Sequence, residues 1–195
     1  MEEHKNTIED INLSEKDRTV KILRVAAGWD LKEYDGENID VDLSCFVLDK
    51  TGQTREDGDF VFYNNLKSAD LSVRHLGDNR DGMGEKDDEA IIIDIAALSY
   101  DIYKIVFVVS IYLADERDQN FTHVENSFVR IVNEETDEEL ARDDMTELFE
   151  DATAVKFCEI ERIGSEWHFH QIHEPLPGGL KQAAESYGCL IASIG

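Results

Sequence analysis

The sequence predicts an all-β protein, a β-sandwich of two mostly antiparallel sheets with a short C-terminal helix. Runs rich in Val, Ile, Leu and Phe recur at intervals of about ten residues, the spacing typical of sandwich strands. Turns rich in Gly, Asp and Asn separate these runs. Several runs alternate apolar with polar residues, which is the pattern of a strand with one buried face.

In the first half of the chain, strands are expected over residues 19–29, 39–49, 59–63 and 90–98. The second of these shows the clearest alternation, because Val41, Leu43, Cys45 and Val47 fall on one side. Asp40 and Asp42 therefore share the other side, about 7 Å apart along the strand. Residues 66–76 are expected to form a loop with a brief strand.

In the second half, residues 103–113 are apolar on both faces and rich in Val and Ile, which predicts a central strand. Two hairpins are expected, one over 127–132 and 139–144 and the other over 155–163 and 166–172. Between the central strand and the first hairpin, the polar stretch has room for a short helix. A terminal helix is expected over residues 180–187, stopped by Gly188.

The 195 residues are enough for one domain with a substantial core. We assign residues 1–17 to a flexible acidic tail and residues 18–195 to the sandwich. The N-terminus is polar rather than a signal peptide, and the longest apolar run, 105–114, is too short to insert into a membrane. The three cysteines include no CxxC pair and are expected to be buried, reduced thiols. These features predict a cytoplasmic protein.

Charge narrows the classes of partner. The chain has 44 acidic and 19 basic residues and a formal net charge of −25. Nucleic acids and anionic membranes are bound through Lys and Arg, so neither is an expected partner. Divalent cations and basic proteins are favoured instead, because a bound cation relieves the repulsion within an acidic chain.

The densest acidic stretch is residues 77–89, a glycine-rich loop that precedes the apolar strand at 90–98. Its oxygen donors are the side chains of Asp78, Asn79, Asp81, Glu85, Asp87, Asp88 and Glu89. Such a loop either lies hydrated in water or folds around a positive charge. Calcium fits the second state best, since it takes six to eight oxygens in flexible geometry.

Other motifs are weak or absent. The acidic loop fails the EF-hand pattern, because Arg80 stands at its third position, and it fails the P-loop pattern. His168, His170 and His173 have a spacing that zinc or copper accepts, but a polar outer face is the commoner arrangement. No Gly-x-Ser-x-Gly elbow occurs, and no cysteine has a basic neighbour that would activate it. We therefore do not expect an enzyme.

Several motifs together resemble the TerD family of bacterial tellurium-resistance and stress proteins. The resemblance covers nearly the whole chain from about residue 18. It is carried by Gly28-Trp29-Asp30, Asp40-Val41-Asp42, the stretch Asp59-Phe60-Val61-Phe62-Tyr63-Asn64-Asn65-Leu66, Gly77-Asp78-Asn79 with Gly82 and Gly84, and Asp87-Asp88-Glu89. Further matches are Lys104-Ile105-Val106-Phe107, Asn126-Ser127-Phe128-Val129-Arg130 and Glu139-Leu140-Ala141-Arg142. The sequence departs from the family pattern at Asp81, where a small polar residue is expected.

The resemblance implies a calcium-binding β-sandwich that acts in resistance to tellurite and other stresses, with protein partners in that system. The implied calcium ligands are Asp40, Asp42, Asp59, Asn64, Asn65, Asp78, Asn79, Asp87, Asp88 and Glu89. They come from three segments at strand ends, which a sandwich can gather at one rim. The number of acidic groups is enough for two calcium ions.

Two alternatives stay open at this point. The same carboxylates would serve a metal-dependent hydrolase or phosphoryl-transfer enzyme, in which Arg80 or Lys86 would meet phosphate. Alternatively, the acidity alone would bind a basic protein without any metal.

Overall fold

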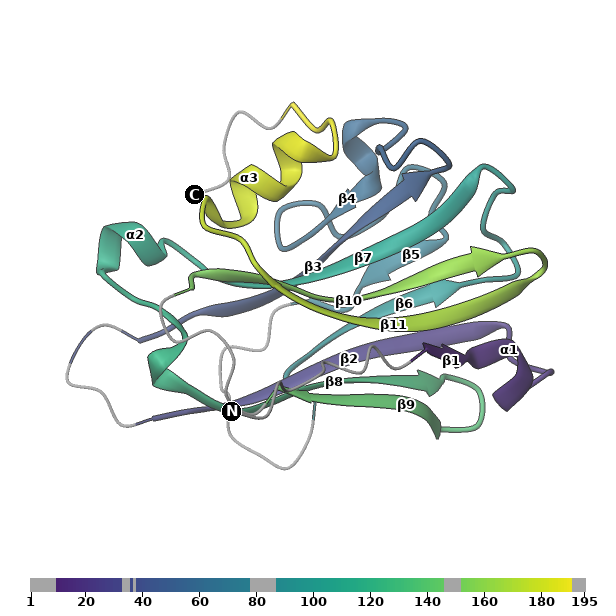
Figure 1. Ribbon diagram of the computed structural model, residues 1–195, viewed down its shortest axis with the longest axis horizontal. Helices are drawn as coiled ribbons and strands as arrows, with labels where there is room; N and C mark the ends of the chain where they lie inside the picture. The colour runs from purple at the N-terminus through teal and green to yellow at the C-terminus, as the bar shows by residue number, and fades with distance from the viewer. Residues whose placement is uncertain (1–9, 33–35, 37, 78–86, 146–151, 191–195) are drawn as a thin grey trace, which may run out of the picture.

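The computed structural model packs two antiparallel sheets face to face (Figure 1), and it describes residues 10–32, 36, 38–77, 87–145 and 152–190. One sheet has six strands in the order β1 (Asp10–Asn12), β11 (Glu166–Pro175), β10 (Ala154–Ile163), β7 (Ile102–Ile111), β3 (Val41–Asp49) and β4 (Phe60–Val61). The other has five, in the order β5 (Val73–His75), β6 (Glu89–Asp94), β2 (Ile22–Leu31), β8 (Val124–Asn133) and β9 (Glu138–Met145). The predicted fold class is confirmed.

Short helical segments complete the described chain. They are α1 (Leu13–Lys16), α2 (Ala114–Arg117), α3 (Gly179–Ser186) and the 3₁₀ turns η1 (Asp57–Asp59) and η2 (Phe121–His123). The predicted hairpins correspond to β8–β9 and β10–β11, and α3 is the predicted terminal helix.

The main core lies between the sheets, and the alternation in β3 explains how it forms. Val41, Leu43, Cys45 and Val47 all belong to this core, together with inward residues of β7. Burying these apolar side chains is the dominant favourable contribution to folding. The residues between them face outward from the six-stranded sheet.

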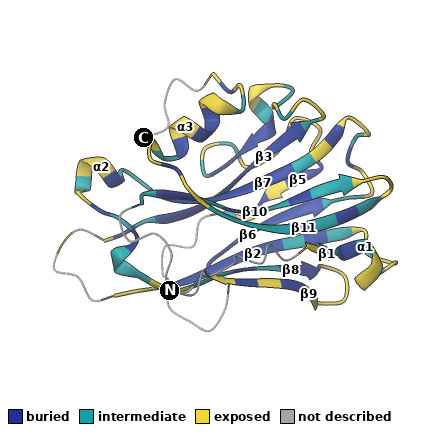
Figure 2. Ribbon diagram, viewed as in Figure 1, coloured by how far each residue is buried: buried dark blue, intermediate teal, exposed yellow. Residues whose placement is uncertain are grey.

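A second apolar cluster covers the outer face of the six-stranded sheet. Phe46, Phe60 and Phe62 stack with centroid separations of 4.3 and 4.2 Å, and Leu180 and Ala183 of α3 pack in the same cluster. Figure 2 shows α3 with its buried side toward the sheet and its exposed side outward. Because of this cover, β7 is buried on both faces, with Phe107 in the main core and Val106 and Val108 in the second cluster. The prediction of a central strand is confirmed.

The structure differs from the predicted tail boundary for residues 10–16. Asp10–Asn12 pair with β11 through Asp10↔His170 and Asn12↔His168, and α1 follows directly. Leu13 is fully buried in the main core. The segment is too short to show a periodic pattern, since it has one buried leucine and a strand of three residues. Such a pattern is what identifies strands in a sequence.

All three cysteines are buried and free, as predicted. Burial raises the pKa of the Cys158 thiol, so this group stays protonated and unreactive. Among the described helices, none is long and apolar enough to cross a membrane. The cytoplasmic location stays a prediction.

Candidate functional site

The acidic segment connects β5 to β6 at one end of the five-stranded sheet. These strands pair through Val73↔Ile93 and His75↔Ile91, so residues 77 and 87 mark the two ends of the connection. The predicted ligands Asp78 and Asn79 lie outside the described residues. The described part of the segment therefore consists of Gly77 and the three acidic residues 87–89.

Asp87 is held by an arginine. Nε and Nη2 of Arg130 donate to its two carboxylate oxygens at 2.7 and 2.8 Å. This contact raises the pKa of the Arg130 guanidinium, and Glu139 contributes to the same shift. Both oxygens of Asp87 thus already have a positively charged partner.

Asp88 attaches the end of the acidic segment to β2 through two hydrogen bonds. Its backbone N–H donates to the carbonyl of Ala27 at 2.8 Å, and its Oδ2 accepts from the Trp29 N–H at 2.8 Å. Burial raises the pKa of the Asp88 carboxyl above its ordinary value, and the negative charges of Asp30 and Asp87 raise it further against the hydrogen bond from Trp29. Burial and the neighbouring negative charges therefore outweigh the stabilising hydrogen bond at this carboxylate.

Glu89 links the two sheets. Its Oε2 accepts from the N–H of Leu43 in β3 at 2.6 Å, and it lies 3.4 Å from Nε2 of His75. Nδ1 of His75 accepts from the Gly77 N–H, so Nε2 carries the hydrogen and donates to the carbonyl of Leu43 at 2.9 Å. The carboxylate of Glu89 is buried in this contact.

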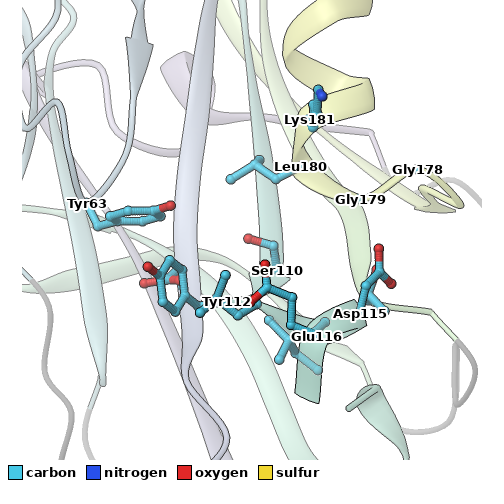
Figure 3. Close-up of a pocket in the computed structure, with 14 residues that line it drawn as sticks. Tyr63, Ser110, Tyr112, Asp115, Glu116, Gly178, Gly179, Leu180 and Lys181 are labelled. Atoms are coloured by element: carbon cyan, nitrogen blue, oxygen red, sulfur yellow. The ribbon is translucent and has the colours of Figure 1, made fainter. Parts of the chain in front are cut away.

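Asp42 lies one residue before Leu43 but belongs to the outer face of the six-stranded sheet. It is buried and lines a cavity beneath α3 together with Tyr63 and Tyr112 (Figure 3). Asp40 precedes β3 and is partly exposed, and its carbonyl accepts from the N–H of Tyr112 at 2.8 Å. The start of β6 thus meets the start of β3 through the contact of Glu89 with Leu43.

Asp59, a further predicted ligand, is bound by an arginine, and its part in a metal site stays a prediction. Asp59 is fully buried, and Arg55 binds it with Nε–Oδ2 and Nη2–Oδ1 distances of 2.7 and 2.9 Å. Phe60 pairs with Phe46, so Asp59 lies toward the far end of β3 from Asp42. The four residue steps from Asp42 to Phe46 alone span about 13 Å. The Asp59 carboxylate therefore has the Arg55 guanidinium as its positively charged partner.

The two asparagines of the same stretch behave differently. Asn65 donates from Nδ2 to the carbonyls of Gly58 and Phe60, at 3.2 and 2.6 Å, which closes the turn after β4. Asn64 is exposed on that turn. Their contribution to a metal site stays a prediction.

Asp70 gives the network around Arg55 a pH dependence. Burial opposes the ionised form, but hydrogen bonds from Ser72, Ser68 and Arg55 outweigh it and lower the pKa of Asp70 from 3.8 to about 2. A carboxylate with a lowered folded pKa stabilises the fold above its unfolded pKa, and this contribution is lost as the pH falls from about 4 to about 2. We expect Asp70→Asn to cost about 1 kcal/mol of unfolding free energy at pH 6, after allowance for solvent screening. The cost should shrink toward pH 3 in urea titrations; a constant difference would contradict this assignment.

The other His, Cys, Asp and Glu side chains that the structure describes do not form a metal centre. Within the described ranges, no three His, Cys, Asp or Glu side chains are arranged to hold a metal ion. His168 and His170 do lie on one face, with ring centroids 6.3 Å apart, and Asp10 of β1 contacts Nδ1 of His168 at 2.9 Å. The Asp10 carboxylate is thus already the partner of the His168 ring.

Sequence reasoning missed the partners of these carboxylates and the cavity beneath α3. Arg55 stands four residues before Asp59, a spacing that gives no signal outside a helix. Arg130 is 43 residues from Asp87 and meets it only through the pairing of β2 with β8. The cavity depends on α2 and α3 reaching the same sheet face, which no local pattern encodes.

Fold and site together define a class of protein: an acidic antiparallel β-sandwich with carboxylates gathered at one strand connection. The model of the TerD domain family matches residues 6–187. The chain therefore belongs to the TerD family of tellurium-resistance and stress-response proteins.

Individual relatives agree with this assignment. Tellurium resistance protein TerD of Alcaligenes sp is 42% identical to this chain, over 92% of the chain and 93% of the relative. General stress protein 16U of Bacillus subtilis (strain 168) is 46% identical over 84% and 86%, respectively. The crystal structure of a homologue of telluride resistance protein (TerD) from Streptomyces coelicolor A3(2) has a TM-score of 0.68 at 21% identity, covering 87% of this chain and 99% of that one. This last likeness supports the fold.

Proposed function

We propose that the chain is a calcium-binding module of the stress response, with its ion held at the acidic segment between β5 and β6. The observation that carries the proposal is the position of Asp88. Trp29 fixes one of its oxygens from inside, and Asp30 and Asp87 crowd it with negative charge. A divalent cation at this point would relieve both the burial and the repulsion of the carboxylate.

The donor set fits calcium in part. Asp88 would hold the ion with Asp78 and Asn79 of the same segment, all of them hard oxygen donors that calcium prefers. Asp59 does not fit, and Asp87 is better placed as the partner of Arg130 than as a ligand. Asp40, Asp42 and Glu89 stay proposed ligands, as does a second ion. The bound ion would offset the excess of acidic over basic residues in the segment.

The biological role that we propose follows the named relatives, one a tellurium resistance protein and another a general stress protein. In this role the chain acts without catalysis, and calcium orders residues 77–89 so that they present a surface to a protein partner. The matched family and the net charge of −25 support a binding module that responds to cations.

Calcium is expected to stabilise the folded chain, and Asp88→Asn to remove most of that gain. At a hundredfold excess over its dissociation constant, a ligand of the folded state adds about 2.7 kcal/mol to the unfolding free energy. Without calcium, the effect of Asp88→Asn on stability should have the opposite sign. The folded pKa of Asp88 is raised, so the ionised carboxylate opposes folding once the pH is above that pKa. An asparagine keeps the acceptor for the Trp29 N–H, so the variant should be at least as stable as the parent in EDTA at pH 7.

Thermal melts in EDTA and in excess calcium test this expectation, with Asp118→Asn as a control at an exposed position of equal charge change. The control should keep the full calcium response. Superimposable melts of the parent chain under the two conditions would overturn calcium binding. An equal response in Asp88→Asn and the parent would move the ion away from Asp88.

A further inference from the structure

Exposed apolar side chains gather at the end of the six-stranded sheet that lies away from the acidic segment. The last residue of β3, Asp49, pairs with the first residue of β7, Ile102. Because β3 has nine residues, the start of β7 lies about 26 Å along the strand from the start of β3. Figure 1 shows the turn of the β10–β11 hairpin beside the start of β7. We call the exposed residues at this end the apolar patch: Tyr100, Tyr103 and Ile163.

Two tight turns position the apolar patch. In the turn before β7, the Ile102 N–H donates to the Ser99 carbonyl at 3.1 Å, and the Ser99 hydroxyl donates to Asp101 at 2.6 Å. These bonds place Tyr100 at the tip of the turn, where it is 90% exposed. In the turn between β10 and β11, Gly164 has a φ of +66°, a left-handed conformation that short hairpin loops favour. The backbone of both turns is thus defined, while the side chains of the patch face solvent.

A stack of rings and a cation supports Tyr100 from beneath. The Arg162 guanidinium lies 4.8 Å from the centroid of the Trp167 ring and 5.5 Å from that of the Tyr100 ring. It is fixed there, because its Nη2 donates to the Ser99 carbonyl at 3.3 Å. Trp167 is buried, whereas Tyr100 is exposed, so the tyrosine ring forms the outer end of the stack. A guanidinium from another molecule would extend the stack through the same cation–π contact.

Carboxylates surround the apolar patch. The side chains of Asp101, Glu161 and Glu166 keep 66, 37 and 47% of their exposure. Arg55 approaches Asp101 at 3.9 Å, and Lys104 approaches Glu161 at 3.9 Å. Both cations make shorter ion pairs with other carboxylates, at 2.7 and 2.5 Å. The patch therefore has an apolar centre and an acidic rim, on a chain with a net charge of −25.

We propose that the apolar patch docks an arginine-containing basic segment of a partner protein. A partner guanidinium stacks on Tyr100 and donates to Asp101, and a neighbouring apolar side chain of the partner packs on Tyr103 and Ile163. An apolar centre within a polar rim is the usual anatomy of a protein interface, and Tyr and Arg are enriched among its hot spots. Positive charge on the partner complements the acidic rim and steers association with so acidic a chain. This surface goes beyond the proposed calcium function and does not depend on it.

Titration of the full chain with a fluorescently labelled peptide of alternating arginine and leucine, at about 150 mM salt, tests the surface. We expect saturable binding, equal in EDTA and in calcium, and none of the neutral peptide in which citrulline replaces arginine. The peptide with lysine in place of arginine should bind about threefold more weakly, because an ammonium lacks the planar face that stacks on a ring. Tyr100→Ser should weaken the arginine peptide about fivefold through loss of the cation–π contact.

Leu31→Ser is the matched control, because Leu31 is an exposed apolar residue at the end of β2 and the substitution also leaves the charge unchanged. It should leave the affinity unchanged, and the melting curves of both variants should match the parent. Amide chemical shifts on peptide addition should move in residues 98–104 and 161–167.

Four results would overturn the proposal: absent or non-saturable binding, equal binding of the citrulline peptide, equal weakening by Leu31→Ser and Tyr100→Ser, or shifts centred on residues 87–89. The last result would move the basic partner to the acidic segment. Calcium binding can fail in the melts described above without any effect on these outcomes.

Discussion

Asp59→Ala is expected to lower the unfolding free energy by about 3 kcal/mol, because removing one partner of a buried ion pair leaves the other uncompensated. Asp59 is fully buried, whereas the Arg55 side chain keeps 22% of its exposure, which places the cost at the lower end of the usual range. Arg55 also contacts Asp70 at 3.1 Å, but that carboxylate cannot replace two hydrogen bonds. Urea unfolding at pH 7 measures the loss.

Glu56→Ala is the matched control for Asp59→Ala. Glu56 is the exposed acidic residue that precedes η1, and its side chain makes no capping hydrogen bond there. Its removal should change the stability by less than about 0.5 kcal/mol. If the two variants lose equal stability, the ion pair with Arg55 contributes nothing specific. A calcium response that disappears with Asp59→Ala while the fold persists would restore Asp59 as a metal ligand.

Gly28→Ala is expected to cost about 2 kcal/mol, because the added methyl group has no room. A Cβ at this position would lie 2.5 Å from both Cε1 and Cζ of the Phe128 ring. The ring cannot simply swing away, since the Arg142 guanidinium stacks on it at 4.1 Å from the centroid. The strand pairing of β2 with β8 also shifts register between Gly28 and Asp30, next to the bond from Trp29 to Asp88.

A double-mutant cycle with Phe128→Leu separates this clash from a general intolerance of alanine. In the Phe128→Leu background, Gly28→Ala should cost less than about 1 kcal/mol, because the shorter side chain leaves the space open. Equal costs in the two backgrounds would show that the backbone conformation, not the ring, requires glycine. Melting temperatures and urea midpoints give the four stabilities of the cycle.

The strands were predictable where their burial has a simple period. The alternation of Val41, Leu43, Cys45 and Val47 indicates one buried face in β3, and the unbroken apolar run of β7 indicates two. Hairpins were predictable because their turns are local. By contrast, β1 is three residues long, and its place beside β11 depends on contacts more than 150 residues away in the chain.

The site was predictable only as a composition. Acidic residues and glycines identify residues 77–89 as a candidate cation site. The sequence alone does not show whether a given carboxylate binds an arginine or a metal ion, because that depends on tertiary contacts. Asp59 illustrates this limit, because Arg55 neutralises it. Asp42 illustrates another, since the alternation that places it opposite Leu43 does not say that α3 will roof the same face and form a cavity there.

The contact of Glu89 and His75 with Leu43 also protects the molecule against self-association. β4 pairs with β3 only at Cys45 and Phe46, so the backbone of Leu43 faces outward beyond the end of its neighbour. An outward N–H and carbonyl of this kind are a template on which a strand of another molecule can add. Here a carboxylate and an imidazole from the opposite sheet occupy both groups. Glu89 and His75 thus satisfy the Leu43 N–H and carbonyl, so a strand of another molecule cannot pair with them.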